Sequence, residues 1–302
     1  MSVLAQLAAR QFLVVTGKGG VGKTVVTALL GRVLASEGRR VLLLEVDPRA
    51  NLHELVGTAP SGGDVVAVGP NVFLQNLKPQ QVMAEVVRDQ LKIEMLVRRV
   101  TASTIFTHFV DAAPGLKEVA ILGHAWRALH GHGPMARLRI DTVVLDAPAT
   151  GQGVSLLTAP VVLSGVVEKG PFGQMAGELA GFIGDSQRTA IVTVTLAEEM
   201  PVQEALELRA ALASRIRRAP ELLVVNGLYP PVPPARRQDG DREADLWQRR
   251  RAINDRELAR LAREWPGPCV QLPLLPVQRG PELVSALTAR FAGALAAEEV
   301  PA

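Results

Sequence analysis

The chain contains one cysteine, Cys269, among its 302 residues. A single cysteine excludes a disulfide bond within the chain, and it cannot by itself build a thiolate cage for a metal ion. The sequence also has no run of 18 apolar residues, so it predicts no transmembrane helix. Because the apolar run at 12–15 leads directly into a glycine-rich loop, we find no separate apolar leader segment at the N-terminus. We therefore expect a cytoplasmic protein.

The sequence also has no large excess of charge of one sign. Its 33 lysines and arginines stand against 30 aspartates and glutamates, which leaves a net charge of +3. This balance gives no support to nucleic-acid binding. The densest basic cluster, at 249–256, is interleaved with acidic residues, so we interpret it as a solvated helix face. Hydrophobic residues at 48% and charged residues at 21% are typical of a soluble globular protein.

Short apolar runs alternate with longer amphipathic stretches along most of the chain. This alternation predicts a parallel sheet covered by helices. The expected strands are residues 12–15, 41–46, 72–77, 142–147, 190–196, 222–226 and 270–275. The expected helices are residues 24–37, 151–159, 173–184, 201–217, 241–264 and 281–297. We predict one doubly wound, mostly parallel α/β domain over residues 1–302.

Two regions depart from the alternation. In residues 78–138, apolar residues such as Val82 and Leu91 recur at helical spacing until Pro114 and Gly115 interrupt the pattern. We predict two or three helices inserted above the sheet there. The proline-rich stretch at 229–241 is predicted to be an extended surface loop.

A glycine-rich loop, T-G-K-G-G-V-G-K-T at 16–24, follows the first predicted strand. Glycine is costly in regular structure, so a cluster of glycines indicates a sharp turn or a close approach to another group. Gly17, Gly22, Lys23 and Thr24 fit the pattern G-x-x-x-x-G-K-T. In that pattern backbone N–H groups and the lysine bind phosphates, and the hydroxyl binds Mg²⁺. The next helix would point its positive end at the same phosphates. The sequence therefore predicts a nucleotide site.

Carboxylates follow two further predicted strands. Asp146 ends the strand at 142–147, where a Mg²⁺-binding role is the natural interpretation and an N-cap of the next helix is the alternative. Asp47 follows the strand at 41–46 and could orient an attacking water, or it could stabilise a turn before Pro48. Glu45 lies on the same face of that strand as Asp47 and could be only a paired or edge residue.

Several segments together resemble one known family. With Lys18 the loop reads G-K-G-G-V-G-K-T, which resembles the deviant Walker A motif of SIMIBI-class ATPases. D-P-R-A-N-L from Asp47 and D-A-P-A-T-G-Q-G from Asp146 resemble the two switch motifs of the ArsA-type anion-transporting ATPases. The stretches at 113–122, 194–208, 224–230 and 272–280 resemble further motifs of that family, so the similarity spans nearly the whole chain. The family includes arsenite-pump ATPases and factors that target tail-anchored membrane proteins.

The resemblance implies roles for individual residues. It implies an ATP-dependent dimer in which Lys18 reaches the partner's nucleotide, while Asp47 positions the attacking water. The Mg²⁺ ligands would be Thr24, Asp47 and Asp146. The phosphate-binding loop would comprise Gly17, Gly19, Gly20, Val21, Gly22, Lys23, Thr24 and Val25, and the adenine side Asn226, Pro273 and Leu274. From the residues alone, Asn226 could equally serve the turn at Gly227.

Some positions depart from the family pattern. Gln152 stands where the family commonly has histidine, and Arg49 with Ala50 replaces an Ala-His pair. Arsenite capture needs several thiolates, so arsenite transport is not expected of a chain with one cysteine. Methionines such as Met83 and Met175 could line a groove for hydrophobic segments or belong to an ordinary core.

We expect a dimeric ATPase with ATP and Mg²⁺ as cofactors, acting on hydrophobic or membrane-protein clients with at most peripheral membrane association. The dimer could be a homodimer or a heterodimer with a paralogous ATPase. A weakly active regulatory subunit and the ATPase of an anion-export system remain alternatives.

Overall fold

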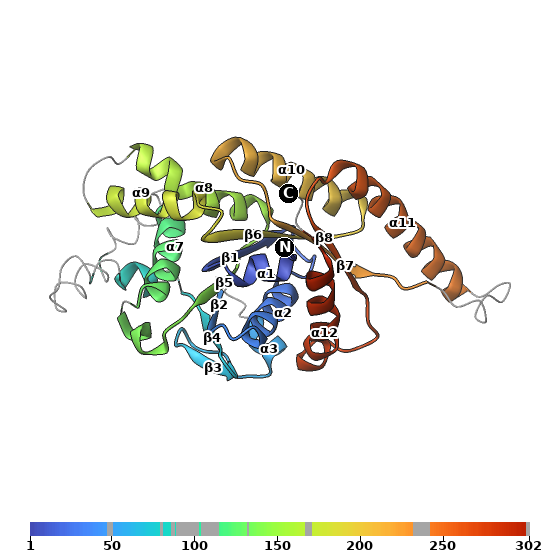
Figure 1. Cartoon of the computed structure of the whole chain (residues 1–302), viewed down its shortest axis with the longest axis horizontal. Helices are drawn as coiled ribbons and strands as arrows, with labels where there is room; N and C mark the ends of the chain where they lie inside the picture. Colours follow the sequence, from blue (N-terminus) through green and yellow to red (C-terminus); the bar gives the residue numbers. More distant parts are fainter. Residues whose placement is uncertain are drawn as a thin grey trace.

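One eight-stranded sheet organises the part of the chain that the computed structural model describes (Figure 1). That part comprises residues 1–46, 51–78, 81–85, 88, 103, 115–131, 133–166, 171–231 and 242–299. The strands are β1 (Phe12–Gly17), β2 (Val41–Glu45), β3 (Val66–Gly69), β4 (Val72–Asn76), β5 (Thr142–Asp146), β6 (Thr189–Leu196), β7 (Leu222–Leu228) and β8 (Cys269–Pro273). Their order is β3-β4-β2-β5-β1-β6-β7-β8, and all neighbouring pairs are parallel except β3 with β4. The predicted doubly wound, mostly parallel sheet is confirmed.

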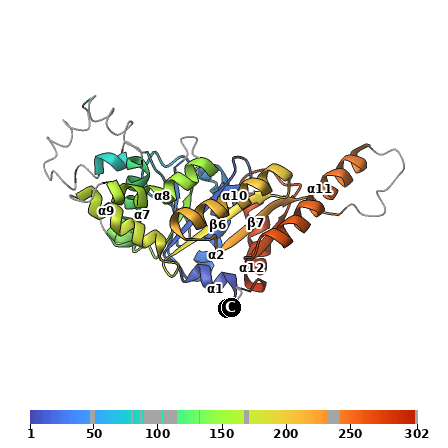
Figure 2. The same ribbon diagram turned by 90° about the horizontal axis from the view of Figure 1, so that it is seen from above.

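Helices cover both faces of this sheet (Figures 1 and 2). The α-helices are α1 (Val3–Ala8), α2 (Lys23–Ser36), α3 (Leu52–Val56), α7 (Leu116–Leu129), α8 (Thr150–Val166), α9 (Pro171–Gly184), α10 (Glu199–Ile216), α11 (Arg242–Glu264) and α12 (Pro281–Ala297). A 3₁₀ helix spans Gly133–Leu138. The sequence prediction did not include α1, α3 or the antiparallel edge strand β3.

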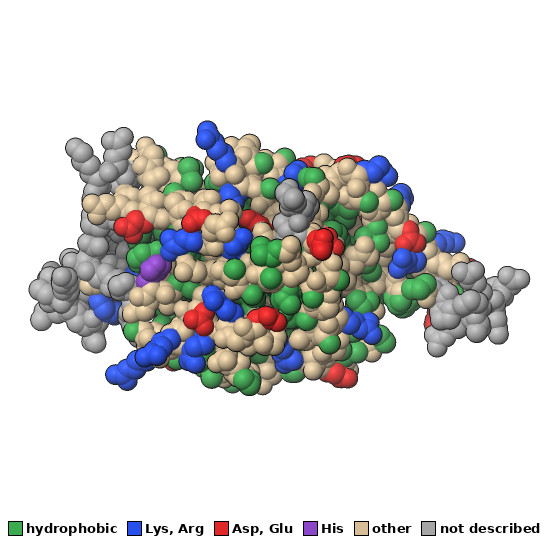
Figure 3. Space-filling model, viewed as in Figure 1, with side chains coloured by type: hydrophobic (Ala, Val, Ile, Leu, Met, Phe, Trp, Pro, Cys, Tyr) green, Lys and Arg blue, Asp and Glu red, His purple; other side chains and the backbone are tan. Residues whose placement is uncertain are grey.

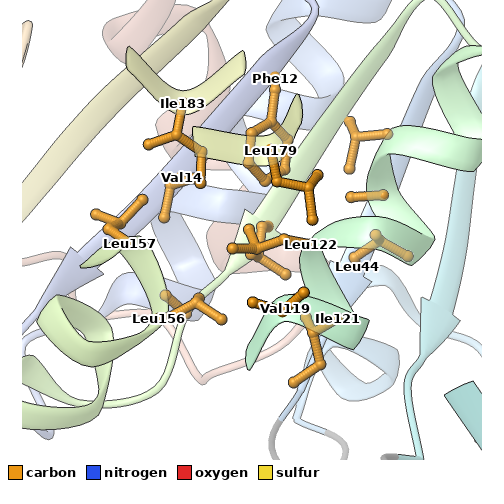
Figure 4. Close-up of a cluster of buried hydrophobic side chains, with 14 of the residues drawn as sticks. Phe12, Val14, Leu44, Val119, Ile121, Leu122, Leu156, Leu157, Leu179 and Ile183 are labelled. Carbon is orange, nitrogen blue, oxygen red and sulfur yellow. The ribbon is translucent and has the colours of Figure 1, made fainter. Parts of the chain in front are cut away.

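The side chains of β1 show how the two faces are filled. Phe12 and Val14 belong to a core cluster beneath α7, α8 and α9, shown in Figure 4. Leu13 and Val15 belong to a second cluster beneath α1, α2, α3 and α12. Strands that are buried on both faces are apolar at every position, which explains the uninterrupted apolar runs of the central strands. A smaller third cluster packs α10 and α11 against β7.

The helices that follow the adjacent strands β1 and β5 pack on opposite faces of the sheet. After β1 it enters α2, which packs in the same core cluster as Leu13 and Val15. After β5 it enters α8, whose Leu156 and Leu157 belong to the other cluster. Open α/β sheets bind ligands in the crevice that such a divergence creates at the carboxyl ends of the strands. The fold therefore places its expected ligand site between the ends of β1 and β5.

Three predicted segments either differ from the structure or lie partly outside the described residues. Much of the proposed insertion at 78–138 lies outside the described residues, and its helix α7 packs directly on β5, α8 and α9 as part of a covering layer. The predicted helix end at 159 was wrong, because α8 continues through Pro160 to Val166. A proline removes one backbone hydrogen bond, but the flanking helical turns persist on both sides of it. Residues 232–241 of the predicted surface loop lie outside the described residues.

The two ends of the described chain lie side by side, because Ser2 and Glu299 form an antiparallel bridge. On the face shown in Figure 3, basic and acidic side chains are interspersed over the described surface. Of the helices in the described ranges, none is long and apolar enough to cross a membrane.

Candidate nucleotide-binding site

The glycine-rich loop connects β1 to α2 at the expected crevice. Gly17, Gly20 and Gly22 have φ values of 146°, 85° and 95°, which side chains rarely adopt. A Cβ on Gly17 would lie 2.2 Å from the Val194 carbonyl oxygen, and a Cβ on Gly22 would lie 2.1 Å from Asn226 Nδ2. Close approach of backbone therefore requires glycine at Gly17, and the positive φ together with the Asn226 side chain favours glycine at Gly22.

The outer side of the loop is accessible to a ligand. Gly19 and Gly20 are exposed, and no atom of the described residues lies within 4 Å of a Cβ built on Gly20. The buried Val21 and half-buried Val25 hold the inner side of the loop against the core. The loop thus presents backbone to the outside while its apolar side chains fix it to the sheet.

Lys23 is the first residue of α2, and its side chain returns over the loop. Its Nζ donates a hydrogen bond to the Lys18 carbonyl oxygen at 2.9 Å. The ammonium group and the positive, N-terminal end of the α2 dipole lie together at the loop, and both favour an anion. Oxygens of a phosphate chain fit this environment.

Asp146 ends β5 beside this loop, in register with Val15 of β1. The Thr27 hydroxyl donates to Asp146 Oδ1 at 3.4 Å, and the Thr24 hydroxyl also hydrogen-bonds the carboxyl group. Burial, with a smaller contribution from the charge of Glu45, raises the pKa of Asp146 to about 7, although Thr24, Lys23 and Thr27 act in the opposite direction. A buried carboxylate oxygen with a neighbouring hydroxyl is a suitable ligand set for Mg²⁺. Thr24 and Asp146 therefore fit the predicted metal site.

Glu45 has a larger part in the site than the sequence indicated. It is 1% exposed, and Asp146 is its register partner on β5. Its Oε1 accepts hydrogen bonds from the backbone N–H groups of Asn51 at 2.5 Å and Leu52 at 2.9 Å, and its Oε2 accepts one from Asn76 Nδ2 at 3.0 Å. Glu45 thus caps the N-terminus of α3, where Asn51 itself makes no side-chain cap in the described structure. The signal for this role was a charged residue inside an otherwise apolar strand.

In the structure, Lys18 forms an ion pair with a residue of the same chain. Its Nζ lies 2.7 Å from Glu204 Oε1 on α10. The sequence did not predict this pair, because Glu204 lies far along the chain on a different element.

The residues predicted on the adenine side lie at the ends of adjacent strands. Asn226 on β7 donates from Nδ2 to the Val21 carbonyl oxygen at 2.9 Å, so it contacts the loop directly. Pro273 ends β8, and the backbone N–H of Leu274 donates to the Leu228 carbonyl oxygen at 2.8 Å. Leu274 is 39% exposed.

The two switch motifs are described only in part. Asp47, Arg49 and Ala50 lie outside the described residues. Gln152 is exposed on the first turn of α8. The next residue, Gly153, is buried, and a Cβ there would lie 2.5 Å from Thr16 Oγ1 on β1. The start of α8 is therefore packed closely against β1.

The lone cysteine does not belong to this site. Burial, and then the nearby charge of Glu298, raise the pKa of Cys269 to about 11, so the thiol is protonated near neutral pH. Within the described ranges, no three His, Cys, Asp or Glu side chains are grouped so that they could hold a metal ion. Among the described residues, the candidate Mg²⁺ ligands are therefore the carboxylate of Asp146 and the hydroxyl of Thr24.

A glycine loop that turns from the first strand into a helix, with its lysine and a buried aspartate at the switch point of a mostly parallel sheet, defines a P-loop nucleotide-binding domain. The model of the anion-transporting ATPase family matches residues 10–176, which is more than half of the chain. The chain belongs to that family.

Curated relatives agree with this assignment. ATPase BagA of Mycobacterium tuberculosis is 32% identical over 214 residues, which are 66% of this chain and 60% of that protein. An arsenical pump-driving ATPase of Acidiphilium multivorum is 26% identical over 256 residues, covering 79% of this chain and 42% of that protein. ATPase ARSA2 of Chlamydomonas reinhardtii is 27% identical over 182 residues, covering 58% of this chain and 46% of that protein. The chain therefore matches only about half of the length of these relatives.

Proposed function

We propose that this chain binds ATP with Mg²⁺ and hydrolyses it. The observation that supports this most directly is the loop itself, in which Lys23 and the start of α2 meet exposed glycine backbone beside Asp146. The loop N–H groups and Lys23 would hold the phosphates, and Thr24 with Asp146 would hold Mg²⁺. The metal ion would neutralise phosphate charge during the reaction. Asp47 would orient the attacking water.

Hydrolysis would occur at a dimer interface. In this proposal Lys18 leaves Glu204 and reaches the nucleotide of the partner subunit, where its charge stabilises the transition state. A cation that acts in this way is worth on the order of 10³–10⁵ in rate. Asn226, Pro273 and Leu274 would hold the adenine base beside the loop.

Turnover would drive opening and closing of the dimer, and this cycle would serve hydrophobic or membrane-protein clients. The lone protonated Cys269 gives no support to capture of arsenite by thiolates. The cytoplasmic location stays a prediction from the sequence.

Two variants test the proposal together. Lys23→Ala should remove ATP binding and turnover. Asp47→Asn should retain ATP binding but trap an ATP-bound closed dimer, seen as a doubled mass in light scattering with ATP. Unchanged steady-state ATPase activity in both variants would contradict the assignment.

Gln152 favours a second candidate, a weakly active regulatory subunit that pairs with a paralogue. It is exposed at the start of α8, at the position where the resemblance places histidine. Light scattering of this protein alone, with a nonhydrolysable ATP analogue, separates the candidates, since only a self-dimerising ATPase doubles its mass. The Asp47→Asn protein can be purified from its native cell together with the proteins that stay bound to it. Identification of those proteins would reveal the client or partner chain.

A further inference from the structure

A cavity of about 370 Å³ lies where α2, α3, β3 and β4 meet, in the lower part of Figure 1. Its described lining residues come from these four elements, from the turn between β3 and β4, and from Leu43 of β2. Its volume lies within the range of small-molecule sites, about 300–1,000 Å³. None of these residues belongs to the glycine loop or hydrogen-bonds Asp146, so the cavity is separate from the candidate nucleotide site.

Small side chains on α2 leave the space for this cavity. Ala28, Arg32 and Ala35 line it and follow one another at spacings of four and three residues, so they lie on one face of the helix. Across from them, Val56 of α3 and Val68 of β3 also line it and are only half-buried. The cavity therefore presents apolar surface that the protein itself does not cover, and a hydrocarbon group would gain from covering it.

Arg32 is the only charged residue among the described lining residues. Its side chain is half-buried, and it makes no hydrogen bond or ion pair with any described residue. The residues three and four positions away on α2 could supply a counter-ion, but they are Ala28, Leu29, Ala35 and Ser36, which carry no charge. Neither its own helix nor the described lining therefore neutralises the Arg32 guanidinium.

The polar groups of the lining also restrict the chemistry of a ligand. The Ser36 hydroxyl donates to the Val33 carbonyl oxygen at 2.6 Å, so its proton is already used. Pro70 has no backbone N–H to offer. The guanidinium of Arg32 has N–H donors and no acceptor. A ligand group beside Arg32 must therefore accept hydrogen bonds, and a carboxylate does so in parallel pairs while it supplies the opposite charge.

From this combination we infer that the cavity binds a monocarboxylate with a short hydrocarbon chain. The carboxylate pairs with Arg32, and the chain lies against Ala28, Ala35, Val56 and Val68. The inference does not depend on nucleotide binding, because the lining residues are separate from the glycine loop.

Three probes separate the contribution of the charge from that of the chain. Octanoate supplies both, so it should bind the nucleotide-free full chain in calorimetry. Octanamide has the same chain without the charge and should bind at least about tenfold more weakly, the loss expected for one charge-assisted pair. Acetate has the charge without the chain and should show no measurable binding. An absence of octanoate binding, or equal binding of octanoate and either of the other two probes, would overturn the inference.

A matched pair of variants tests the role of Arg32. Arg32→Gln should weaken octanoate binding by about tenfold and change octanamide binding little, so that the preference for the charged probe disappears. Arg215→Gln is the control, because Arg215 is exposed on α10, whose Leu208 and Leu212 pack on the opposite face of the sheet. It should leave the binding of both probes unchanged. A preference that persists in Arg32→Gln, or an equal loss in Arg215→Gln, would contradict the assignment.

A variant that fills the cavity tests the place of the hydrocarbon chain. Ala35→Phe puts a large side chain into the space and should abolish binding of octanoate and octanamide together. Circular dichroism confirms that the variant is folded. Octanoate binding of wild-type strength in folded Ala35→Phe protein would place the probe elsewhere and overturn the inference. Because Arg32 has no described hydrogen-bond partner to lose, Arg32→Gln decides the inference even if Ala35→Phe does not fold.

Discussion

Lys18 and Glu204 form an ion pair within one chain, with 2.7 Å between Lys18 Nζ and Glu204 Oε1. Their side chains are 31% and 28% exposed, so solvent weakens the pair to about 0–1 kcal/mol. If Lys18 acts on the nucleotide of a partner subunit, this pair has to open first. Glu204 would then hold the nucleotide-free chain in a form that does not dimerise.

Removing the charge of Glu204 should favour the dimer. Glu204→Gln should increase ATP-dependent self-association and steady-state ATPase activity by up to about fivefold. This factor corresponds to about 1 kcal/mol, the upper limit for the contribution of the Lys18–Glu204 ion pair. Glu207→Gln, three residues further along α10 and exposed, is the matched control and should change neither quantity. If the two variants behave alike in sedimentation and turnover assays, the pair has no restraining role.

Glu45 should be a major contributor to local stability. Glu45→Ala leaves the N–H groups of Asn51 and Leu52 and the amide of Asn76 without their acceptor, so we expect a loss of about 3 kcal/mol in the free energy of unfolding. Glu45→Gln keeps an acceptor oxygen and should lose much less. Urea denaturation of the two variants makes the comparison. A Glu45→Ala protein within about 0.5 kcal/mol of wild type would contradict the capping role.

The buried Asp146 should make the stability of the metal-free protein depend on pH. Its pKa is about 7 in the fold against 3.8 ordinarily, so between these values the unfolded chain has released a proton that the folded chain retains. Stability should therefore fall as pH rises from about 4 to about 7, by up to about 4 kcal/mol from this group, and then level off.

The variant Asp146→Asn removes this titration. Its free energy of unfolding, measured by denaturant titration with a chelator and without nucleotide, should change less between about pH 5 and pH 8 than that of wild type. Asp245→Asn, which is exposed on α11, should keep the wild-type pH dependence. Identical pH profiles for Asp146→Asn and wild type would show that Asp146 titrates in the ordinary range.

Two glycines of the loop should respond differently to alanine. Gly20→Ala places a side chain at φ 85° with no described atom within 4 Å, so only backbone strain of about 1–2 kcal/mol is expected. Gly22→Ala has φ 95° and also collides with Asn226 Nδ2, so it should weaken nucleotide binding more strongly. Equal affinities for the two single variants, measured by fluorescence titration, would contradict this geometry.

The sequence was sufficient for the sheet and for the glycine loop between β1 and α2, because both depend on local patterns. Apolar runs such as 41–46 are long enough to identify buried strands, and the loop motif depends on spacing within 16–24. The edge strand β3 is short and, among the described residues, pairs only with β4, so its stability comes from the neighbouring strand rather than from its own residues. The predicted helix 151–159 stops just before Pro160, where local propensity opposes a helix, but the packing of α8 against α7 and α9 overrides that preference.

The contacts that the sequence did not reveal join residues far apart in the chain. Glu204 meets Lys18 only because α10 lies over the end of β1. Asn226 reaches Val21 because β7 brings it to the loop from 205 positions away. No periodicity or spacing encodes such pairs, whereas the family resemblance pointed to Asn226.

The central claim is that the glycine loop binds a nucleotide through its backbone and Lys23. Isothermal titration with a nonhydrolysable ATP analogue and Mg²⁺ tests it most directly. The account predicts one site per chain in the wild-type protein and its loss in Lys23→Ala. An absence of heat for every adenine and guanine nucleotide with the wild-type protein, or an unchanged affinity in Lys23→Ala, would contradict it.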